Sequence, residues 1–452
     1  MISVNPATEE LLAERQPHDD SEIERALECS ANAARAWGST ALSDRTAALI
    51  ALADLIDHRC DRLARLVTTE MGKRLSEARD EAEKCAAVCR YYATAAAGFL
   101  ADEPIDTDAT RSFVAYQPLG SVLAVMPWNF PLWQVFRCAV PALTAGNAVL
   151  LKHASNVSLC ALALADLFLD AGLPRGVFQT LLVGSDRVAA LIRDPRIHAI
   201  SLTGSTAAGR ATAELAGAAL KPTVLELGGS DAFVVLGDAD LDDAVANAVK
   251  SRFQNAGQSC IAAKRFIVEE SVADRFVDSF TAAVECLQPG DPLDEATTLA
   301  PMARRALRDE LHVQVERALS GGARTLTGCR PSARRGFFYE PSILEYTKPD
   351  RSAHDEELFG PVAVIMRAPN EAAALALANA TPFGLGGSVW TRDAARGEGF
   401  ARGLACGSAF VNGLVKSDPR LPFGGIKASG YGRELSRHGL HEFVNIKTIW
   451  RA

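Results

Sequence analysis

The sequence predicts an α/β protein built on doubly wound parallel sheets. The chain has 452 residues, which is too long for one compact core, so two or three domains are expected. Its composition, 48% hydrophobic and 23% charged residues, is typical of a globular protein. Between residues 147 and 227, short apolar strands alternate with helices. This alternation is typical of a parallel sheet that binds a nucleotide.

The first half of the chain is expected to begin with helices and continue into that sheet. Helices are expected over residues 21–100, because the stretch 44–70 repeats leucine and isoleucine at helical spacing. Two short strands are expected next, at Ser112–Tyr116 and Gly120–Met126. The alternating region is expected to contain strands at 147–152, 177–183, 197–202 and 223–227, and helices at 158–171, 186–192 and 205–216.

A second α/β unit is expected to follow the first. Its predicted strands are 232–236, 265–268, 362–366, 387–390 and 408–411. Its predicted helices are 241–253, 272–287, 304–319 and 371–379. The tail, residues 442–450, is expected to form a final strand.

Composition also argues against several classes of partner. The net charge of −8, without a dense run of lysine and arginine, argues against binding to nucleic acid. Arg137 is the one charged residue from Phe113 to Leu151, but four prolines interrupt that segment, so we expect buried strands and loops there and no membrane span. The N-terminus does not resemble a signal peptide. The ten cysteines lack metal-binding spacing, which predicts no metal site and a cytoplasmic location.

Four local stretches carry residues suited to chemistry. In Gln-Asn-Ala-Gly-Gln-Ser-Cys-Ile-Ala-Ala-Lys-Arg (254–265), Cys260 follows a flexible loop and precedes Lys264 and Arg265, two cations that would favour a thiolate. An ordinary loop cysteine is the alternative. Glu226 ends an apolar strand before two glycines, where burial would suit it to general-base work, or to a structural role bonded to backbone amides.

The other two stretches supply a donor and an anion site. Asn129 lies in Pro-Trp-Asn-Phe-Pro (127–131), where it would either fix a turn or donate a hydrogen bond to an oxyanion. Gly204 and Gly209 bracket a strand-to-helix turn whose helix N-terminus would favour a phosphate. Together, the four stretches match the needs of oxidative acyl transfer.

Seven stretches in this order resemble the NAD(P)-dependent aldehyde dehydrogenases over nearly the whole chain. They are 127–131, 151–155, 203–205, 226–229, 257–260, 357–361 and 422–434. The resemblance implies two Rossmann-like doubly wound domains plus a β oligomerisation arm, and oxidation of an aldehyde to a carboxylic acid through a cysteine thiohemiacetal and thioester.

The resemblance also implies residue roles. Cys260 matches the nucleophile, Asn129 the oxyanion donor and Glu226 the base that activates water. Residues matching the cofactor site are Trp128, Lys152, Ser155, Gly204, Ser205, Leu227, Glu357 and Phe359. Because Ser155 is small and neutral where a glutamate would repel a 2′-phosphate, we expect NADP to be preferred, with NAD also possible. Some related enzymes form a regulatory disulfide near the nucleophile, but Ser259 and Ile261 flank Cys260 and supply no such partner.

Arg137 bears on the identity of the aldehyde. A buried guanidinium is costly without an anionic partner, which would be either a substrate carboxylate or an internal Asp or Glu. If Pro131 lies in the first turn of a helix, Trp133 and Arg137 share one face of it. The stretches 131–137, 227–231 and 439–450 resemble the short bacterial succinate-semialdehyde dehydrogenases. That resemblance implies that Trp133, Arg137 and Ser417 bind the carboxylate of succinic semialdehyde.

The family architecture implies a cofactor domain over 1–104 and 120–228, a catalytic domain over 229–428, and an oligomerisation hairpin and tail over 105–119 and 429–452. A homodimer or homotetramer is therefore expected, because the exposed edge of the arm would need a partner sheet. Two alternatives remain. One is an aldehyde dehydrogenase for another small, neutral or aromatic aldehyde, with Arg137 structural. The other is a non-catalytic binding or structural protein on the same fold.

Overall fold

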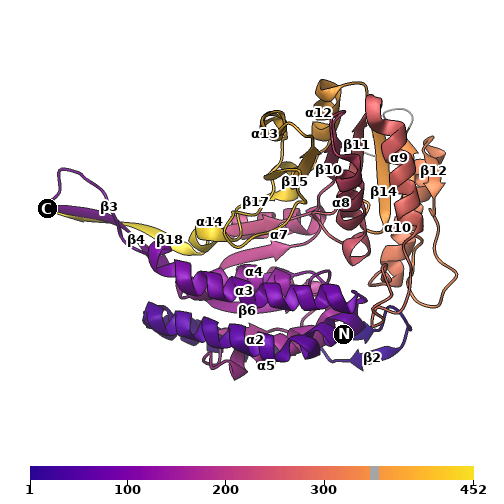
Figure 1. The fold of residues 1–452 in the computed structure, drawn as a ribbon. Helices are drawn as coiled ribbons and strands as arrows, with labels where there is room; N and C mark the ends of the chain where they lie inside the picture. The colour runs from indigo at the N-terminus through magenta and orange to yellow at the C-terminus, as the bar shows by residue number, and fades with distance from the viewer. Residues whose placement is uncertain (347–355) are drawn as a thin grey trace.

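The computed structural model describes residues 1–346 and 356–452, which form two large sheets flanked by helices and a projecting arm (Figure 1). The first sheet has the strand order β17-β9-β8-β5-β6-β7, and all its pairs are parallel except that of β17 with β9. Its strands are β5 (Ser121–Met126), β6 (Ala148–His153), β7 (Phe178–Thr180), β8 (Ile197–Thr203), β9 (Thr223–Glu226) and β17 (Gly430–Tyr431). The four strands predicted over 147–227 are therefore present, β7 being shorter than expected.

Long helices precede this sheet and pack on it. They are α1 (Asp20–Ser39), α2 (Leu42–Met71) and α3 (Leu75–Phe99). α1 begins with a capping box in which Asp19 accepts from the amide of Glu22 and Glu22 accepts from that of Asp19, which satisfies two free amides. The helices inside the alternating region are α5 (Ser158–Asp170), α6 (Val188–Arg193) and α7 (Thr206–Ala218). Apolar side chains of α2 and α3 form one buried cluster with those of the sheet.

One expectation, that for the segment Phe113–Leu151, is wrong. We expected buried strands and loops there, but Trp133–Ala145 forms the helix α4, with Pro141 inside it. Every residue of α4 is buried, including its few polar side chains, and the internal Pro141 argued against a helix in the sequence. Trp133 and Arg137 lie one turn apart on it, as the helical hypothesis predicted. Within the described residues, no helix is long and apolar enough to cross a membrane.

The second sheet has the order β12-β13-β14-β11-β10-β15-β16 and is parallel except for β12. Its strands are β10 (Asp231–Val235), β11 (Ala263–Glu269), β12 (Arg324–Thr327), β13 (Ser342–Tyr346), β14 (Val362–Ala368), β15 (Gly386–Trp390) and β16 (Ser408–Val411). Its helices are α8 (Leu241–Phe253), α9 (Glu270–Glu285), α10 (Arg305–Ser320), α12 (Glu371–Asn379) and α13 (Ala394–Gly403). Because the chain passes from β9 to β10 through Leu227–Ser230, Glu226 lies where the two sheets meet.

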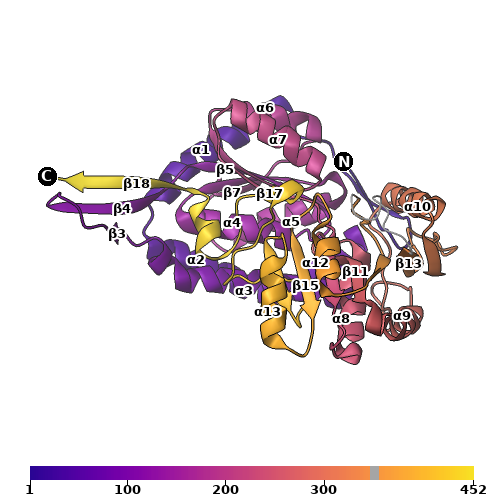
Figure 2. The ribbon, with the colours of Figure 1, turned by 90° about the horizontal axis from the view of Figure 1, so that it is seen from above.

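An arm of three strands extends away from both sheets and ends at the C-terminus (Figures 1 and 2). It consists of β3 (Glu103–Pro104), β4 (Arg111–Pro118) and β18 (Val444–Arg451), the last following the short helix α14 (Ser436–His441). β18 pairs antiparallel with β4 from Val444 opposite Pro118 to Arg451 opposite Arg111. The tail strand is confirmed, whereas the domain boundaries given above stay predictions; residues 347–355 of the predicted catalytic domain lie outside the described part.

Candidate active site

Cys260 lies in the wall of a small cavity of about 110 Å³ between the two sheets. Side chains from α3, α4, the loop before β11 and the segment 414–423 line this cavity. Besides Cys260, the lining includes three other predicted site residues, Trp133, Arg137 and Ser417, and also Lys84, Phe130 and Phe423. The structure therefore brings the predicted nucleophile and the predicted carboxylate-binding residues together around one cavity.

The loop that carries Cys260 is held in an unusual backbone conformation. Asn255, Ala256 and Gly257 have φ angles of 54°, 51° and 72°, which L-residues rarely adopt. Gly257 is required because a Cβ there would lie 2.3 Å from the carbonyl oxygen of Gly360. Arg252 joins the same two backbones, donating to the carbonyls of Gly257 and Gly360, each at 2.6 Å. This buried arginine thus ties the Cys260 loop to the loop that follows Phe359.

Two cations act on the Cys260 thiol. Its pKa is raised to about 12, because the effect of burial exceeds the opposing effects of Arg137 and Lys264. Lys264 is buried and donates to the carbonyls of Ser259 and Cys260, each at 2.7 Å, so it also anchors the loop. Arg265 behaves differently from its expected role, because its guanidinium turns away to the carbonyls of Ser230, Leu377 and Ala378.

Asn129 is buried beside the same loop. Its Nδ2 donates to the carbonyl of Gln258 at 3.1 Å, two residues before Cys260. The backbone carbonyl of Asn129 accepts a hydrogen bond from Asn255 Nδ2 at 2.8 Å. Since an amide nitrogen has two hydrogens, one remains for an oxygen bound at Cys260. Both earlier hypotheses for Asn129, turn-fixing and oxyanion donation, are compatible with this geometry.

Glu226 belongs to a buried cluster of three charged groups. Arg137 Nη2 lies 3.9 Å from Glu226 Oε2, and Arg137 Nε forms an ion pair with Glu434. All three side chains are at most 2% exposed. Burial raises the pKa of Glu226, Arg137 opposes the rise and Glu434 adds to it. No side chain among the described residues donates a hydrogen bond to Glu226, and a contact with the backbone of Gly425 lowers its pKa, so the carboxylate keeps acceptor capacity for a water molecule.

Arg137 therefore has an internal anionic partner. Glu434 comes from the far end of the chain, and sequence reasoning gave it no role although it lay in a matched stretch. The guanidinium also donates to Thr203 Oγ1 at 3.3 Å and stacks 4.6 Å from the centre of the Phe423 ring. Arg137 still lines the cavity, so the geometry permits both a structural and a substrate-binding role.

Lys84 is a cavity residue that sequence reasoning missed. It lies on α3 within the stretch expected to be helical, where a lysine is usually on a solvated face. Its Nζ donates to Ser417 Oγ at 2.7 Å and lies 4.2 Å from the centre of the Trp133 ring. Trp133 Nε1 donates to the same Ser417 oxygen at 3.1 Å. Nothing local in the sequence distinguishes this lysine from its solvated neighbours.

The predicted cofactor residues are spread along the carboxyl edge of the first sheet. Lys152 is on β6 and Ser155 follows it, while Gly204 and Ser205 lie between β8 and α7. Ser205 caps α7 by accepting from the amide of Ala208 at 3.2 Å, so the N-terminus of α7 faces this edge. Lys152 is largely buried and has no ion-pair or hydrogen-bond partner among the described residues. Burial lowers its pKa. A free ammonium, a hydroxyl and a helix N-terminus suit a dinucleotide phosphate.

Of the remaining cofactor residues, Glu357 is linked to the Cys260 loop through Lys264. Glu357 Oε1 accepts from the amide of Gly229 at 3.1 Å and lies 3.4 Å from Lys264 Nζ. A Cβ on Gly228 would lie 2.4 Å from Glu357 Oε2, so the glycine makes room for that carboxylate. Trp128 and Phe359 meet edge to face, with ring centres 5.8 Å apart. Leu227 packs against Gly209, where a Cβ would lie 2.5 Å from its methyl groups. These residues fit a dinucleotide that runs from Lys152 towards Cys260.

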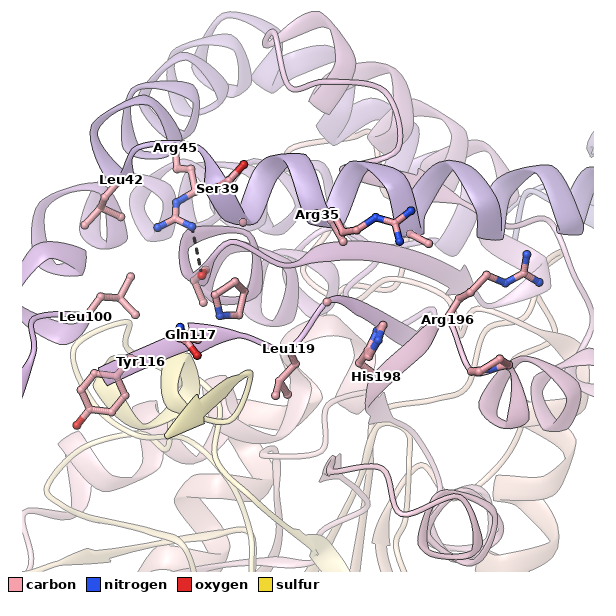
Figure 3. A pocket seen from close by; sticks show the side chains of 17 residues that line it. Arg35, Ser39, Leu42, Arg45, Leu100, Tyr116, Gln117, Leu119, Arg196 and His198 are labelled. Atoms are coloured by element: carbon pink, nitrogen blue, oxygen red, sulfur yellow. Dashed lines mark hydrogen bonds between the residues drawn. The ribbon is translucent and has the colours of Figure 1, made fainter. Parts of the chain in front are cut away.

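A second, larger hollow of about 930 Å³ lies at the base of the arm (Figure 3). Arg35, Arg45, Arg196 and His198 line it, and Arg45 donates to the carbonyl of Ala145 at 3.3 Å, which caps the end of α4. This hollow holds none of the residues predicted for catalysis, cofactor or substrate. Size alone therefore does not identify the reactive site.

Comparison with known proteins agrees with this geometry. The model of the aldehyde dehydrogenase family matches residues 1–449. The chain belongs to the aldehyde dehydrogenase family. Members of this family oxidise aldehydes to acids.

Two relatives match along their whole length. The chain is 48% identical over 452 residues to a protein of Synechocystis sp. named probable succinate-semialdehyde dehydrogenase (NADP+), with 100% of both chains covered. It is 49% identical over 455 residues to succinate-semialdehyde dehydrogenase (NADP+) 1 of Mycobacterium tuberculosis, again covering 100% of both. Among solved structures, the succinic semialdehyde dehydrogenase of Streptococcus pyogenes in complex with NADP+ matches with a TM-score of 0.97 and 37% identity, covering 99% of each chain.

These matches confirm the aldehyde dehydrogenase fold with its Rossmann-like sheets. Within residues 1–346 and 356–452, no group of three or more His, Cys, Asp or Glu side chains is arranged to hold a metal ion.

Proposed function

We propose that this aldehyde dehydrogenase oxidises succinic semialdehyde to succinate with NADP, and that Cys260 forms the covalent intermediate. The observation that carries the proposal is the cavity itself. It places a cysteine beside a small space lined by cations and apolar side chains, which suits a small aldehyde that bears a carboxylate. The names of the full-length relatives support the same substrate and cofactor.

The proposed reaction begins when the Cys260 thiolate adds to the aldehyde carbon. Arg137 and Lys264 favour the thiolate, since both lower the thiol pKa against the effect of burial. Asn129 Nδ2 and the Cys260 amide hold the resulting alkoxide. Bound NADP would supply a hydride acceptor at its nicotinamide ring, so that loss of a hydride from the former aldehyde carbon leaves the acyl group joined to Cys260 as a thioester.

Glu226 is proposed to take a proton from water in the second half of the reaction. The water oxygen then attacks the Cys260 thioester, the carbon–sulfur bond breaks, and the acid and the thiolate are released. A carboxyl group with a raised pKa suits this role, because proton transfer is most efficient when the base pKa approaches the working pH. No side chain among the described residues donates a hydrogen bond to Glu226, so the carboxylate has acceptor capacity left to orient the water.

For the cofactor, we propose that Lys152 and Ser155 hold the adenosine ribose and its 2′-phosphate. Lys152 supplies charge, and Ser155 is exposed and neutral, so neither repels a phosphate. Gly204 and Ser205 at the N-terminus of α7 hold the pyrophosphate, and Leu227 lines the same crevice. Trp128, Glu357 and Phe359 hold the nicotinamide ribose and ring beside Cys260.

We also propose that the chain forms a homodimer or homotetramer through its arm. Six of the eight residues of β18 are exposed, namely 445–448, 450 and 451, and exposed strand edges pair readily with another sheet. A cytoplasmic location is proposed as well, since all ten cysteines are free.

The test follows absorbance of the reduced nicotinamide with succinic, glutaric and butyric aldehydes, each with NADP and NAD. We expect the highest kcat/KM for succinic semialdehyde with NADP, and no turnover in Cys260→Ser. A preference for butyraldehyde would support the alternative, an aldehyde dehydrogenase for neutral substrates. Undiminished oxidation by Cys260→Ser would refute the covalent route.

A further inference from the structure

Lys84 occupies the substrate cavity as a fixed cation. It lies on α3, which packs against α4 (Figure 1), and it lines the same cavity as Cys260. Two contacts hold its ammonium group in place: the hydrogen bond to Ser417 Oγ and the face of the Trp133 ring. A lysine that merely covers a helix surface would extend into solvent.

The described residues give Lys84 no carboxylate partner. It forms no ion pair in residues 1–346 and 356–452, and the nearby acids are engaged elsewhere. Glu81 pairs with Lys73 and accepts from the amides of Leu132 and Trp133. Asp418 pairs with Arg420 at 2.7 Å. An amine that is largely removed from water without a counter-ion is costly, so an anion that enters the cavity gains a strong partner here.

Ser417 adds a second donor at the same place. Its Oγ accepts from both Lys84 Nζ and Trp133 Nε1, which leaves its own hydrogen free. No acceptor for that hydrogen is found in the described part of the chain. An ammonium group and a hydroxyl hydrogen thus converge, which is the arrangement that binds a carboxylate.

Arg137 contrasts with Lys84. It is paired with Glu434 and lies 3.9 Å from Glu226. Its charge is already matched inside the protein, and drawing it to a substrate would weaken the cluster that surrounds the proposed base. Three cations line the cavity: Arg137 is paired, Lys416 is exposed to solvent, and Lys84 is the one that is largely removed from water without an ion pair among the described residues.

We propose that Lys84, seated by Trp133 and Ser417, is the principal partner of the substrate carboxylate and so determines the preference for an aldehyde acid over a neutral aldehyde. The inference rests on the proposed function, because it assigns the residue that recognises the carboxylate. It assigns a substrate-binding residue, while the chemistry at Cys260 is unchanged.

A pH effect follows. The pKa of Lys84 is lowered to about 8, first by burial and then by Arg137 on α4, while Cys85 and Glu81 on α3 and Asp418 act in the opposite direction. The cation is therefore present below about pH 8 and is lost as the pH rises through that value. Since the substrate carboxylate stays ionised over this range, affinity for the acid aldehyde should fall with Lys84 deprotonation.

The experiment measures one ratio, kcat/KM for succinic semialdehyde divided by kcat/KM for butyraldehyde. Titrations of Cys260 and Glu226 affect both substrates and cancel in the ratio. In Lys84→Met we expect the ratio to fall about 10- to 100-fold, the usual effect of losing a hydrogen bond to a charged group. Lys416→Met is the matched control, because Lys416 also lines the cavity. Its ratio should stay within about threefold of that of the unaltered enzyme, well below a single charged hydrogen bond.

A second measurement keeps the test decisive if Lys84→Met does not fold. The ratio is measured from pH 6.5 to 9.5 in the unaltered enzyme and in Lys84→Arg, which keeps its charge throughout. We expect a fall above about pH 8 in the first and a flat profile in the second.

The outcomes separate the two proposals. A ratio below one in the unaltered enzyme would overturn the proposed function. A ratio well above one that survives Lys84→Met, that collapses in Lys416→Met, or that shows no pH dependence would overturn the Lys84 inference alone.

Discussion

Replacing Arg137 by methionine should destabilise the protein strongly. The substitution removes the ion pair to Glu434 and the charge near Glu226, and both carboxyl groups are 2% exposed or less. Removing one partner from a buried pair costs about 3–5 kcal/mol, because the other charge is left without compensation. For a domain of roughly 150–250 residues, this loss of free energy corresponds to a fall in Tm of roughly 6 to 20 °C.

The loss of stability in Arg137→Met should increase as the pH rises. Burial already raises the pKa values of Glu226 and Glu434 above their ordinary value of 4.5, and without Arg137 both rise further. A carboxyl group whose pKa is higher in the folded state binds its proton more tightly there. Stability is therefore lost as the pH rises above about 4.5 towards the folded pKa. The deficit of Arg137→Met should be smaller at pH 5.5 than at pH 8.

The assay compares Tm of the unaltered protein and Arg137→Met at both pH values. The double variant Arg137→Met/Glu434→Gln removes one uncompensated charge and should recover part of the loss. Arg196→Met is the surface control, since Arg196 is 27% exposed and pairs with Glu24 near solvent, where ion pairs contribute about 0–1 kcal/mol. A loss in Arg137→Met no larger than that control, or a loss that grows on acidification, would refute the reasoning.

Two further substitutions test the loop and the cofactor site. Gly257→Ala should lower kcat/KM at least tenfold with every aldehyde. The left-handed backbone conformation costs an alanine about 1–2 kcal/mol, and the new Cβ would lie 2.3 Å from the Gly360 carbonyl and 2.4 Å from Arg252. Steady-state kinetics, measured together with Tm, test this prediction, and unchanged kinetics would contradict the assigned strain. Ser155→Glu should shift kcat/KM from NADP towards NAD by roughly tenfold or more, because its carboxylate would repel the 2′-phosphate near Lys152. Ser155→Ala is the neutral control, and an equal loss with both dinucleotides would place residue 155 outside the phosphate site.

The fold could be predicted where local pattern and tertiary environment agree. The strands β5, β6, β8 and β9 and the helix α8 were expected at nearly their observed positions, because each is a short apolar run or an amphipathic period bounded by turn residues. The helix α4 was not, because its segment is mostly apolar with a single charge, a pattern that also suits buried strands. Pro141 inside α4 added to the misinterpretation, since proline usually ends a helix.

The site residues also fall into two groups, those that the sequence suggested and those that it did not. Cys260, Glu226 and Asn129 lie in short stretches whose composition already suggested chemistry, and the structure gathers Cys260 and Asn129 at one loop. Glu434 and Lys84 could not be assigned, because their roles depend on contacts between distant parts of the chain. Lys84 in particular looks like any lysine of a surface helix until α4 and the segment holding Ser417 close over it.

The sequence correctly indicated that Arg137 needs an anionic partner, but it did not identify that partner. A guanidinium in an apolar segment does require an anion, and the structure supplies one inside the protein, Glu434. A cation that is already paired gains little from a second anion, because binding is measured against the free enzyme, where the charge is satisfied. Selectivity for a carboxylate must then come from a cation that the free enzyme leaves unmatched. In this cavity Lys84 meets that condition, since its described contacts are a hydroxyl and an aromatic face.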